Sequence, residues 1–279
     1  MKIIVTGGYG FIGSSFVNLC NELEHDVTIV DKITYAANPN NIKKSTKCIH
    51  KDICDITSDD LGEYDYLVNF AAESHVDNSI SNGLPFVKTN VEGTFNLLEG
   101  ARKNPNLKKF VQISTDEVYG DMESRRMGEA NESTSLQPSS YYSATKAAAD
   151  HLVESAGRTY GLPYLITRTC NNYGVNQHHE KFLPTIAKSI KEDKPVPLYG
   201  DGKQMREWIW VEDNVRLIYD LMISQIGIWN IGSGDTWTNR SIIQQIGVIL
   251  NKKVKLEHVE DRLGHDRRYS VDFTKLQLL

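Results

Sequence analysis

The chain has 279 residues, of which 40% are hydrophobic and 24% charged, and its formal net charge is −5. A chain of this length buries a sizeable core in one large domain or in two closely joined ones. The acidic balance argues against a nucleic-acid-binding protein, which needs a basic face, but is compatible with a small anionic ligand held by a few Arg and Lys side chains.

Strands and helices alternate along the first 170 residues. Short apolar runs predict strands at 2–8, 26–32, 64–72, 108–115 and 163–169. Helices are expected at 11–23, 85–103 and 140–161. In the first of these, apolar residues recur at helical spacing, and the last is rich in alanine. Such alternation is typical of βαβ units whose strands form a parallel sheet with helices on both faces.

The pattern changes beyond about Thr169, where Asn, Gly, Pro and His cluster between short strand and helix candidates. We therefore expect an α/β fold, with a Rossmann-type doubly wound parallel sheet and a smaller mixed lobe. The sheet domain is expected to hold residues 1–170, with 205–229 returning to it. The lobe is expected to hold residues 171–204 and 230–279.

A glycine-rich stretch, TGGYGFIG, joins the first strand to the first helix. It contains Gly8-x-Gly10-x-x-Gly13, and Gly7 extends the pattern. Glycines at this spacing allow a tight turn and a close backbone approach to a pyrophosphate, while the helix N-terminus offers free N–H groups. A purely structural turn also collects glycine, so the context decides between the two interpretations.

That context includes Asp31 at the end of the following strand, eighteen residues past Gly13. An acid at this position binds the adenosine ribose diol and repels a 2′-phosphate. The stretch therefore predicts an NAD site with NAD preferred over NADP, a preference that the neighbouring Lys32 weakens slightly.

Two adjacent acids, Asp116 and Glu117, directly follow the apolar strand at 108–115, in the segment STDEVYG. Burying a carboxylate is costly unless it is paired or hydrogen-bonded. Either this is an ordinary solvated corner, or the acids do chemistry. Both can reach one cleft only if the strand has ended there, because consecutive side chains on a strand point to opposite faces.

Tyr142 and Lys146 lie four residues apart on the predicted helix 140–161 and so share a face. An ammonium near a phenol is expected to lower the pKa of the tyrosine from its usual value of about 10. Tyr142 is thereby a candidate base for a sugar or alcohol hydroxyl. A Tyr and a Lys at this spacing are common on surface helices, so the pair taken alone favours no function. In combination with the nucleotide-binding pattern, it favours a catalytic role.

Other residue types give mainly negative expectations. The four cysteines, at 20, 48, 54 and 170, lack metal or redox spacing and are expected to be reduced thiols. No apolar run reaches the length of a membrane span, and the chain enters a strand without a leader-like segment. His178, His179 and Glu180 lack a third ligand at suitable spacing, so no metal is expected. We expect a cytoplasmic protein.

Segments along nearly the whole chain resemble the dTDP-glucose 4,6-dehydratase family, a branch of the extended short-chain dehydrogenase/reductases. The matching segments include VTGGYGFIGS, NFAAESHVDNSI, TNVEGT, STDEVYG, YYSATKAAAD, RTCNNYG, EKFLP, PLYGDGKQMREWIWVEDN, NIGSG and DRLGHDRRYSVD. Leu263 departs from the pattern, because the family usually has proline there. The loop that holds it is therefore expected to be less stiff.

The resemblance implies a role for each residue that matches a family motif. The implied catalytic set is Thr115, Asp116, Glu117, Tyr142 and Lys146. The implied NAD contacts are Gly7, Gly10, Phe11, Ile12, Gly13, Asp31, Lys32, Thr34, Asp52, Ile53, Ala71, Ala72, Thr89, Tyr142, Lys146 and Asn172. The implied substrate contacts are Ser74, His75, Asn171, Lys181, Phe182, Arg206, Asn230, Arg262 and His265.

The implied reaction dehydrates a nucleoside-diphosphate-glucose, with thymidine or uridine as the nucleoside. Tyr142 would take the 4-hydroxyl proton while hydride leaves carbon 4, Glu117 would remove the carbon-5 proton, and Asp116 would protonate the departing 6-hydroxyl. An epimerase or decarboxylase of the same superfamily would share Tyr142 and Lys146 but would not need the two acids. A non-enzymatic NAD-sensing protein is a further alternative, and a homodimer is implied by the resemblance.

Overall fold

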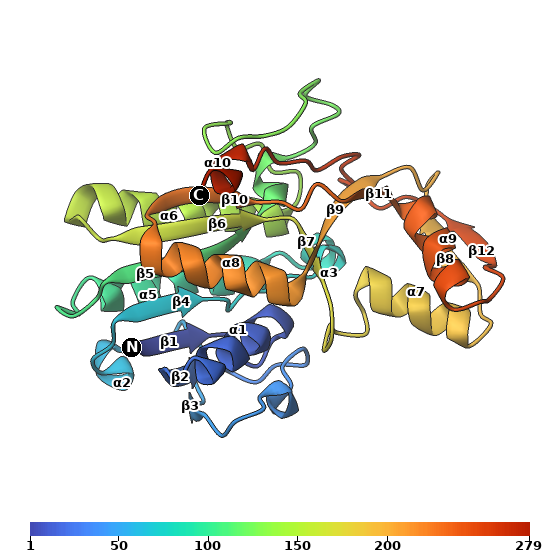
Figure 1. Cartoon of the computed structure of the whole chain (residues 1–279). Helices are drawn as coiled ribbons and strands as arrows, with labels where there is room; N and C mark the ends of the chain where they lie inside the picture. Colours follow the sequence, from blue (N-terminus) through green and yellow to red (C-terminus); the bar gives the residue numbers. More distant parts are fainter.

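The computed structural model describes all 279 residues and contains a seven-stranded parallel sheet (Figure 1). Its strands are β1 (Lys2–Thr6), β2 (Asp26–Val30), β3 (Lys47–Ile49), β4 (Tyr66–Asn69), β5 (Lys109–Thr115), β6 (Tyr164–Thr169) and β10 (Gly227–Ile231). They lie in the order β10-β6-β5-β4-β1-β2-β3, and every pair is parallel. The chain reverses direction across the sheet at β1 and β4, as in doubly wound nucleotide-binding folds, and the predicted fold class is confirmed.

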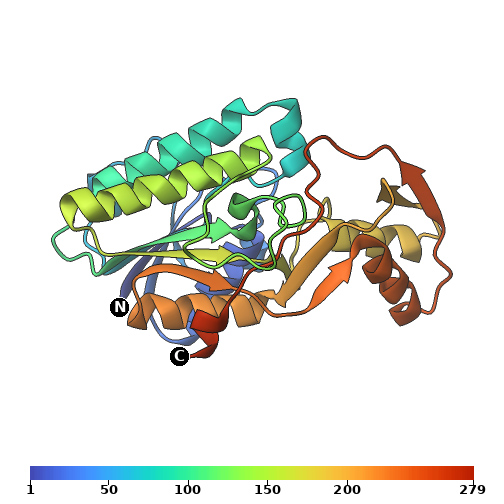
Figure 2. The same ribbon diagram turned by 90° about the horizontal axis from the view of Figure 1, so that it is seen from above.

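Helices cover both faces of this sheet. They include α1 (Phe11–Glu22), α5 (Thr94–Ala101), α6 (Tyr141–Tyr160) and α8 (Val211–Ser224). Helices α1 and α8 pack on one face, and α5 and α6 lie side by side over the other (Figure 2). Alternate residues of β1 divide between the two cores: Ile3 and Val5 join the α1–α8 side, and Ile4 joins the opposite side. The continuous apolar runs in the sequence reflect this burial on both faces.

A smaller lobe extends beyond the carboxyl ends of the strands, at the right of Figure 1. It contains β7 (Asn171–Tyr173), α7 (Phe182–Lys191), β8 (Val196–Tyr199), β9 (Met205–Trp210), β11 (Thr236–Thr238), α9 (Asn239–Ile249) and β12 (Leu256–Val259). Strand β9 pairs parallel with β7 and antiparallel with β11, while β8 and β12 form a separate parallel pair. Helices α7 and α9 pack together over a core that includes Ile186, Ile190 and Ile243.

The chain passes between the two parts in a way that the predicted boundaries only partly describe. Residues 205–210 form β9 in the small sheet, and the return to the large sheet begins with α8. Residues 230 and 231 complete β10, the edge strand of the large sheet, and the last helix, α10 (Thr274–Gln277), packs against β10 (Figure 2). The assignment of 230–279 as a whole to the lobe is therefore wrong at both ends.

The helix predicted over 85–103 consists of three joined pieces. A short α4 (Leu84–Phe86) leads into the π-helical segment η2 (Val87–Gly93) and then into α5. Within η2, Asn90 is buried, and its side chain bonds both the N–H and the carbonyl of Glu73, as well as the Thr145 hydroxyl. These bonds tie the loop after β4 to helix α6. No helix in the protein combines the length and the apolar character that crossing a bilayer requires.

Candidate functional site

A cavity of about 590 Å³ lies between the large sheet and the smaller lobe. On the sheet side its walls come from the carboxyl ends of the strands: Gly7 after β1, Asp31 after β2, Ala71 after β4, Thr115 on β5 and Thr169 on β6. Ligands of doubly wound sheets bind in such a crevice, at the point where the strand order reverses.

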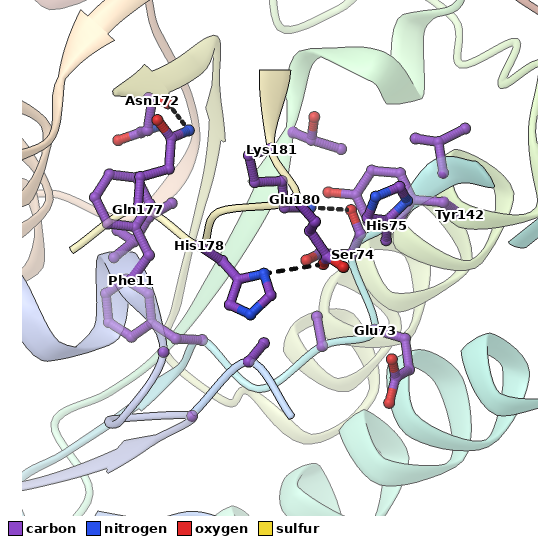
Figure 3. Close-up of a pocket in the computed structure, with 18 of the residues that line it drawn as sticks. Phe11, Glu73, Ser74, His75, Tyr142, Asn172, Gln177, His178, Glu180 and Lys181 are labelled. Carbon is purple, nitrogen blue, oxygen red and sulfur yellow. Dashed lines mark hydrogen bonds and ion pairs between the residues drawn. The ribbon is translucent and has the colours of Figure 1, made fainter. Parts of the chain in front are cut away.

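The structure brings nearly all the predicted site residues together. Every one of them lines the cavity except Asp116 and Asn230. Figure 3 shows part of this lining, with Ser74, His75 and Lys181 on one side and Phe11 and Asn172 on the other.

The glycine turn at the start of α1 leaves no room for side chains. Gly7 has a φ of +64°, and a Cβ there would lie 2.7 Å from the Ala71 nitrogen. A Cβ on Gly13 would collide with the Gly7 carbonyl oxygen. No side chain caps the N-terminus of α1. The exposed helix end and the tight turn fit a pyrophosphate, as the sequence pattern predicts.

Asp31 and Lys32 explain the expected preference for NAD over NADP. The Asp31 carboxylate is held by the N–H groups of Tyr9 (3.0 Å) and Ile33 (2.7 Å) and faces the cavity. The Lys32 ammonium lies 3.3 Å from Asp52 Oδ2 and 3.8 Å from Glu73 Oε1. Because Lys32 already has two acidic partners, it offers little attraction to a 2′-phosphate, and Asp31 repels one.

The two adjacent acids follow a strand that ends just before them. Strand β5 stops at Thr115, and a 3₁₀ turn, η3 (Asp116–Tyr119), begins with the Thr115 hydroxyl accepting from the Glu117 N–H at 3.3 Å. Glu117 lines the cavity. Asp116 does not: it lies behind the wall, 2% exposed, with Oδ1 accepting from the Thr115 hydroxyl at 3.2 Å and Oδ2 unpartnered. The two acids therefore do not form a solvent-exposed turn. Of the two, only Glu117 reaches the cavity.

Burial perturbs both acids. It raises the pKa of Asp116 to about 8, with the negative charges of Glu117 and Glu207 acting in the same direction. Burial also raises the pKa of Glu117, against the opposing pull of Arg206 and Arg262. At neutral pH, Asp116 is thus mainly a proton donor, while the two cations favour the carboxylate form of Glu117.

Tyr142 and Lys146 lie on one face of α6, near its start. A capping box of Ser140 and Ser143 fixes the first turn. The Lys146 ammonium donates to the Ile113 carbonyl at 2.5 Å, and burial lowers its pKa to about 8. Burial raises the pKa of Tyr142, and the charge of Glu117 adds to the increase. The prediction that the pKa of Tyr142 lies below its usual value is therefore wrong for this cleft, because desolvation and the charge of Glu117 raise it.

Three cations gather on the lobe side of the cavity. Arg206 donates to the Asp266 carbonyl at 3.0 Å and stacks over the Tyr269 ring at 4.3 Å. The Arg262 guanidinium lies 3.4 Å from Asp77 Oδ1, and its Nε is buried without a partner. Lys181 donates to the Ser74 carbonyl at 3.0 Å, as Figure 3 shows. Guanidinium forks and an ammonium on one wall suit the oxygens of a diphosphate.

Two of the three histidines that line the cavity, His75 and His265, are neutral at neutral pH. Burial lowers the pKa of His265 to about 4, although its Nδ1 lies 2.5 Å from Asp261 Oδ1, because Arg262 and Arg206 oppose that partner. Burial also lowers the pKa of His75, and Lys181 adds to the effect. Both rings therefore act as hydrogen-bonding groups and add no charge to the site.

Asn230, a predicted substrate contact, does not line the cavity. Its side chain is fully buried under the loop at 130–132. It accepts from the Tyr119 hydroxyl at 2.8 Å and donates to the carbonyls of Ala130 and Asp272. Asn230 thus fastens the C-terminal segment to the large sheet, away from the cavity.

Several cavity residues are absent from the predicted site, although they lie in segments that match the family. Glu73, Asp77, Pro197, Tyr199 and Trp208 all line the cavity. Trp208 is buried, as its place in an apolar strand suggests, but its ring stacks on Phe182 and forms part of the cavity wall. Behind the cavity lining, the Tyr269 hydroxyl lies 3.4 Å from Glu117 Oε2 and 2.7 Å from Asp266 Oδ2. In the sequence, only the two arginines that precede Tyr269 in DRRYS set this residue apart.

His178 and Glu180 also line the cavity, and Figure 3 shows them facing each other, with His178 Nδ1 3.5 Å from Glu180 Oε1. The His179 ring lies against that of His178, with ring centroids 4.2 Å apart. No three His, Cys, Asp or Glu side chains in the protein form a group that could hold a metal ion. The Glu180 carboxylate instead accepts from the Tyr35 hydroxyl at 3.2 Å.

Comparison with known proteins gives matches along the full chain. Residues 3–232 match the model of the NAD dependent epimerase/dehydratase family. The low-salt glycan biosynthesis protein Agl12 of Haloferax volcanii is 43% identical, over 100% of this chain and 92% of that protein. The dTDP-glucose 4,6-dehydratase of Haemophilus influenzae is 40% identical, over 99% of this chain and 91% of that enzyme.

Solved structures agree with these matches. DesIV, a dTDP-glucose 4,6-dehydratase from Streptomyces venezuelae crystallised with NAD, superposes with a TM-score of 0.95 at 38% identity, over 100% of this chain and 90% of that one. A UDP-glucose 4-epimerase from Thermotoga maritima superposes with a TM-score of 0.93 at 27% identity, over 100% of this chain and 92% of that one. Fold alone does not separate the two activities, but sequence identity is higher with the dehydratase.

Proposed function

Because this chain belongs to the NAD dependent epimerase/dehydratase family, we propose that it is an NAD-dependent 4,6-dehydratase of a nucleoside-diphosphate-glucose. The observation that carries the proposal is the buried pair Asp116 and Glu117, one acid with a pKa of about 8 beside another that lines the cavity with Tyr142 and Lys146. Removing water across two neighbouring carbons requires one proton donor and one acceptor whose pKa values are pushed apart.

The residues present fit the cofactor. The tight glycine turn, the uncapped start of α1 and the Asp31 carboxylate would hold the pyrophosphate and the adenosine ribose of NAD. When bound, NAD⁺ supplies an acceptor for the hydride that leaves carbon 4, and the reduced form can return it to carbon 6. The protein's part is to orient the sugar, move protons and keep water out.

In the first step, Tyr142 takes the proton of the 4-hydroxyl. Burial and Glu117 raise the pKa of Tyr142, so the phenol needs nearby positive charge to act as a base. Lys146, one helical turn away, supplies one such charge. The Thr115 hydroxyl, at the end of β5, lines the same wall and can hydrogen-bond the sugar.

In the second step, a 4-keto group makes the carbon-5 proton acidic, and Glu117 removes it. Arg206 and Arg262 favour the charged form of Glu117 that this step requires. Asp116 protonates the departing 6-hydroxyl, which requires its buried side chain to turn toward the cavity from its position behind the wall. Arg206, Arg262 and Lys181 hold the diphosphate throughout.

The direct test is to incubate the protein with NAD⁺ and an equal mixture of dTDP-glucose and UDP-glucose, and to identify products by mass spectrometry. A product lighter by one water, with a 4-keto-6-deoxy sugar, is expected. Recovery of only the galacto epimer, which has the mass of the substrate, would instead assign the chain to the epimerases. The mixture also reveals which nucleoside is preferred, a choice between thymidine and uridine that the proposal leaves open.

The pKa of Asp116 predicts how the reaction depends on pH. The protonated acid is present below about pH 8 and is lost as the pH rises through that value. Above pH 8, sugar that has been oxidised but not dehydrated is expected to accumulate relative to product, as measured by rapid quenching and mass spectrometry. Loss of the Lys146 proton in the same range slows oxidation itself, so it lowers both species together. An unchanged ratio of the two species from pH 7 to pH 9 would contradict a proton-donating role for Asp116.

Replacing Asp31 by Asn is expected to weaken NAD binding by about 10-fold or more, because a charge-assisted hydrogen bond contributes about 1.5–3 kcal/mol. The same change reduces the discrimination against NADP, since the repelling charge is gone. Titration calorimetry with NAD and NADP measures both effects. Asp26→Asn is the matched control, since Asp26 lies exposed at the opposite end of β2. Equal affinities of the Asp31→Asn variant and the parent for NAD would refute the assignment.

A homodimer and a cytoplasmic location stay predictions. The outward faces of α5 and α6, which lie side by side in Figure 2, expose Phe95 (53%) and Tyr141 (64%), and Leu84 of α4 is 73% exposed. Apolar side chains gathered on two neighbouring helices suit burial against a second copy. Light scattering on the eluted protein, with Phe95→Asp as the disrupting variant, tests this.

A further inference from the structure

A buried ion pair lies directly beyond the catalytic lysine, in a part of the protein that the proposed reaction does not use. Asp150 follows Lys146 by four residues on α6, so the two share a helix face. Arg168, on β6, donates from Nε to Asp150 Oδ2 at 3.0 Å. The side chains of Arg168 and Asp150 are 2% and 0% exposed.

The hydrogen-bonding capacities of Lys146 and Asp150 are each only partly used. The Lys146 ammonium has three donors, and the structure gives it one acceptor, the Ile113 carbonyl. Asp150 Oδ1 is buried without a well-aligned hydrogen bond, and the Ser114 hydroxyl, which also lacks one, is the polar group close enough to act on the Asp150 carboxylate. A fully buried carboxylate thus lies one helical turn from an ammonium that lines the cavity and is itself only 4% exposed. Attraction between charges is strong where so little solvent reaches them.

The other groups around Asp150 fix it in place. Arg168 donates from Nη1 to the Tyr119 hydroxyl at 3.0 Å and to the Glu132 carbonyl at 3.5 Å, and its guanidinium stacks over the Tyr119 ring at 4.9 Å. The Tyr119 hydroxyl in turn donates to Asn230. The charged or titratable groups near Asp150 are therefore Lys146 and Tyr142 from α6 and Arg168 from β6. Beyond Arg168 lie Tyr119 from η3 and Glu132 from the loop before α6.

We propose that Asp150 is a positioning residue that keeps Lys146 protonated at neutral pH, with Arg168 holding the Asp150 carboxylate in place. This role of Asp150 rests on the proposed function in one respect: Lys146 is taken to serve the oxidation step. The direction of the charge effect agrees, since burial lowers the pKa of Lys146 to about 8 while Asp150 acts against that decrease. The competing explanation is that Asp150 merely neutralises a buried arginine.

The test reads Lys146 directly, without substrate or cofactor. Protein labelled with ¹⁵N-lysine is titrated by NMR, and the Lys146 ammonium signal is identified by its loss in Lys146→Met. In Asp150→Asn, the titration midpoint of Lys146 is expected to fall by about one pH unit or more. In Asp150→Glu, which restores the charge, it is expected to return toward the parent value. An unchanged midpoint in Asp150→Asn overturns the proposal.

The matched control is Tyr119→Phe. It removes the hydrogen bond that the Tyr119 hydroxyl accepts from Arg168 and the one that it donates to Asn230, but it leaves the Asp150 charge intact. It is expected to lower the melting temperature while leaving the Lys146 midpoint unchanged. If Asp150→Asn fails to fold, the Lys146 midpoint in Asp150→Asn combined with Arg168→Met is compared with that in Arg168→Met alone, so that only the Asp150 charge differs. The double variant is expected to have the lower midpoint, and equal midpoints in these two folded variants also overturn the proposal.

Kinetics give a second readout once turnover has been established. In Asp150→Asn, the high-pH decline of cofactor reduction is expected to move to lower pH, with KM little changed. Failure of the proposed function would appear as no turnover by the parent protein, and the NMR titration would still decide the role of Asp150.

Discussion

Replacing Tyr142 by Phe is expected to lower the rate of sugar oxidation by about 10²- to 10⁴-fold, because no other group takes the 4-hydroxyl proton. The ring keeps its place, since its edge-to-face contact with Phe86, at 6.4 Å between centroids, does not involve the hydroxyl. Cofactor reduction, followed by the absorbance of NADH, measures the step directly.

The matched control is Tyr141→Phe, which removes the hydroxyl of the adjacent tyrosine, a residue 64% exposed to solvent. That variant is expected to turn over at the parent rate. If the Tyr142 hydroxyl acts only in the chemical step, the affinity of Tyr142→Phe for NAD⁺ is expected to be nearly the same as that of the parent protein. Undiminished cofactor reduction in Tyr142→Phe would remove this residue from the mechanism and would favour a binding module over an enzyme.

The second large effect is expected from Glu117→Gln. This variant keeps the shape of the side chain but cannot accept the carbon-5 proton, so dehydration is expected to fall by about 10²- to 10⁴-fold. Oxidation at carbon 4 is expected to continue, because Tyr142 and Lys146 are untouched. Reduced cofactor and undehydrated keto-sugar should therefore accumulate on the protein, as detected by NADH absorbance and mass spectrometry of quenched samples.

Solvent exchange provides the diagnostic for Glu117. In deuterated water the parent protein incorporates deuterium at carbon 5, and the Glu117→Gln variant is expected not to. Glu123→Gln, at an exposed position a few residues along the chain, serves as the control. Full product formation by Glu117→Gln would mean that Asp116 and Glu117 have only a structural role at the end of the strand. The epimerase alternative would then be favoured.

The cofactor half of the site follows from the sequence because its determinants are local. The glycine turn, the helix after it and Asp31 all lie within about one βαβ unit, and parallel strands bring their carboxyl ends to one edge. Gly7 and Asp31 therefore meet in the structure, and Thr115, from much later in the chain, joins them at the same edge.

The errors come from side-chain direction, which sequence proximity does not determine. On β10, Trp229 and Ile231 point into the core beneath α1 and α8, so Asn230 between them must point to the opposite face, under Ala130. On η3, the turn that carries Glu117 into the cavity places Asp116 behind the wall.

The pKa of Tyr142 could not be predicted from the sequence, for a different reason. Charge proximity along a helix can be read from the sequence, whereas the degree of desolvation depends on every element that covers the group. The lobe residues Pro197 and Tyr199 escape prediction for a related reason: they reach the cavity only through the pairing of β8 with β12, sixty residues away in the chain.

The late position of β10 in the chain has a consequence for folding. β10 pairs with β6, but residues 170–226, which include much of the lobe, lie between them in the chain. Until residue 231 has been synthesised, β6 is the edge strand of the sheet. Its residues Leu165 and Ile166 are apolar and are fully buried in the complete fold, so this edge is a site for aggregation. A fragment that ends at residue 170 is therefore expected to precipitate, and the full chain is expected to melt in one cooperative transition in which sheet and lobe unfold together.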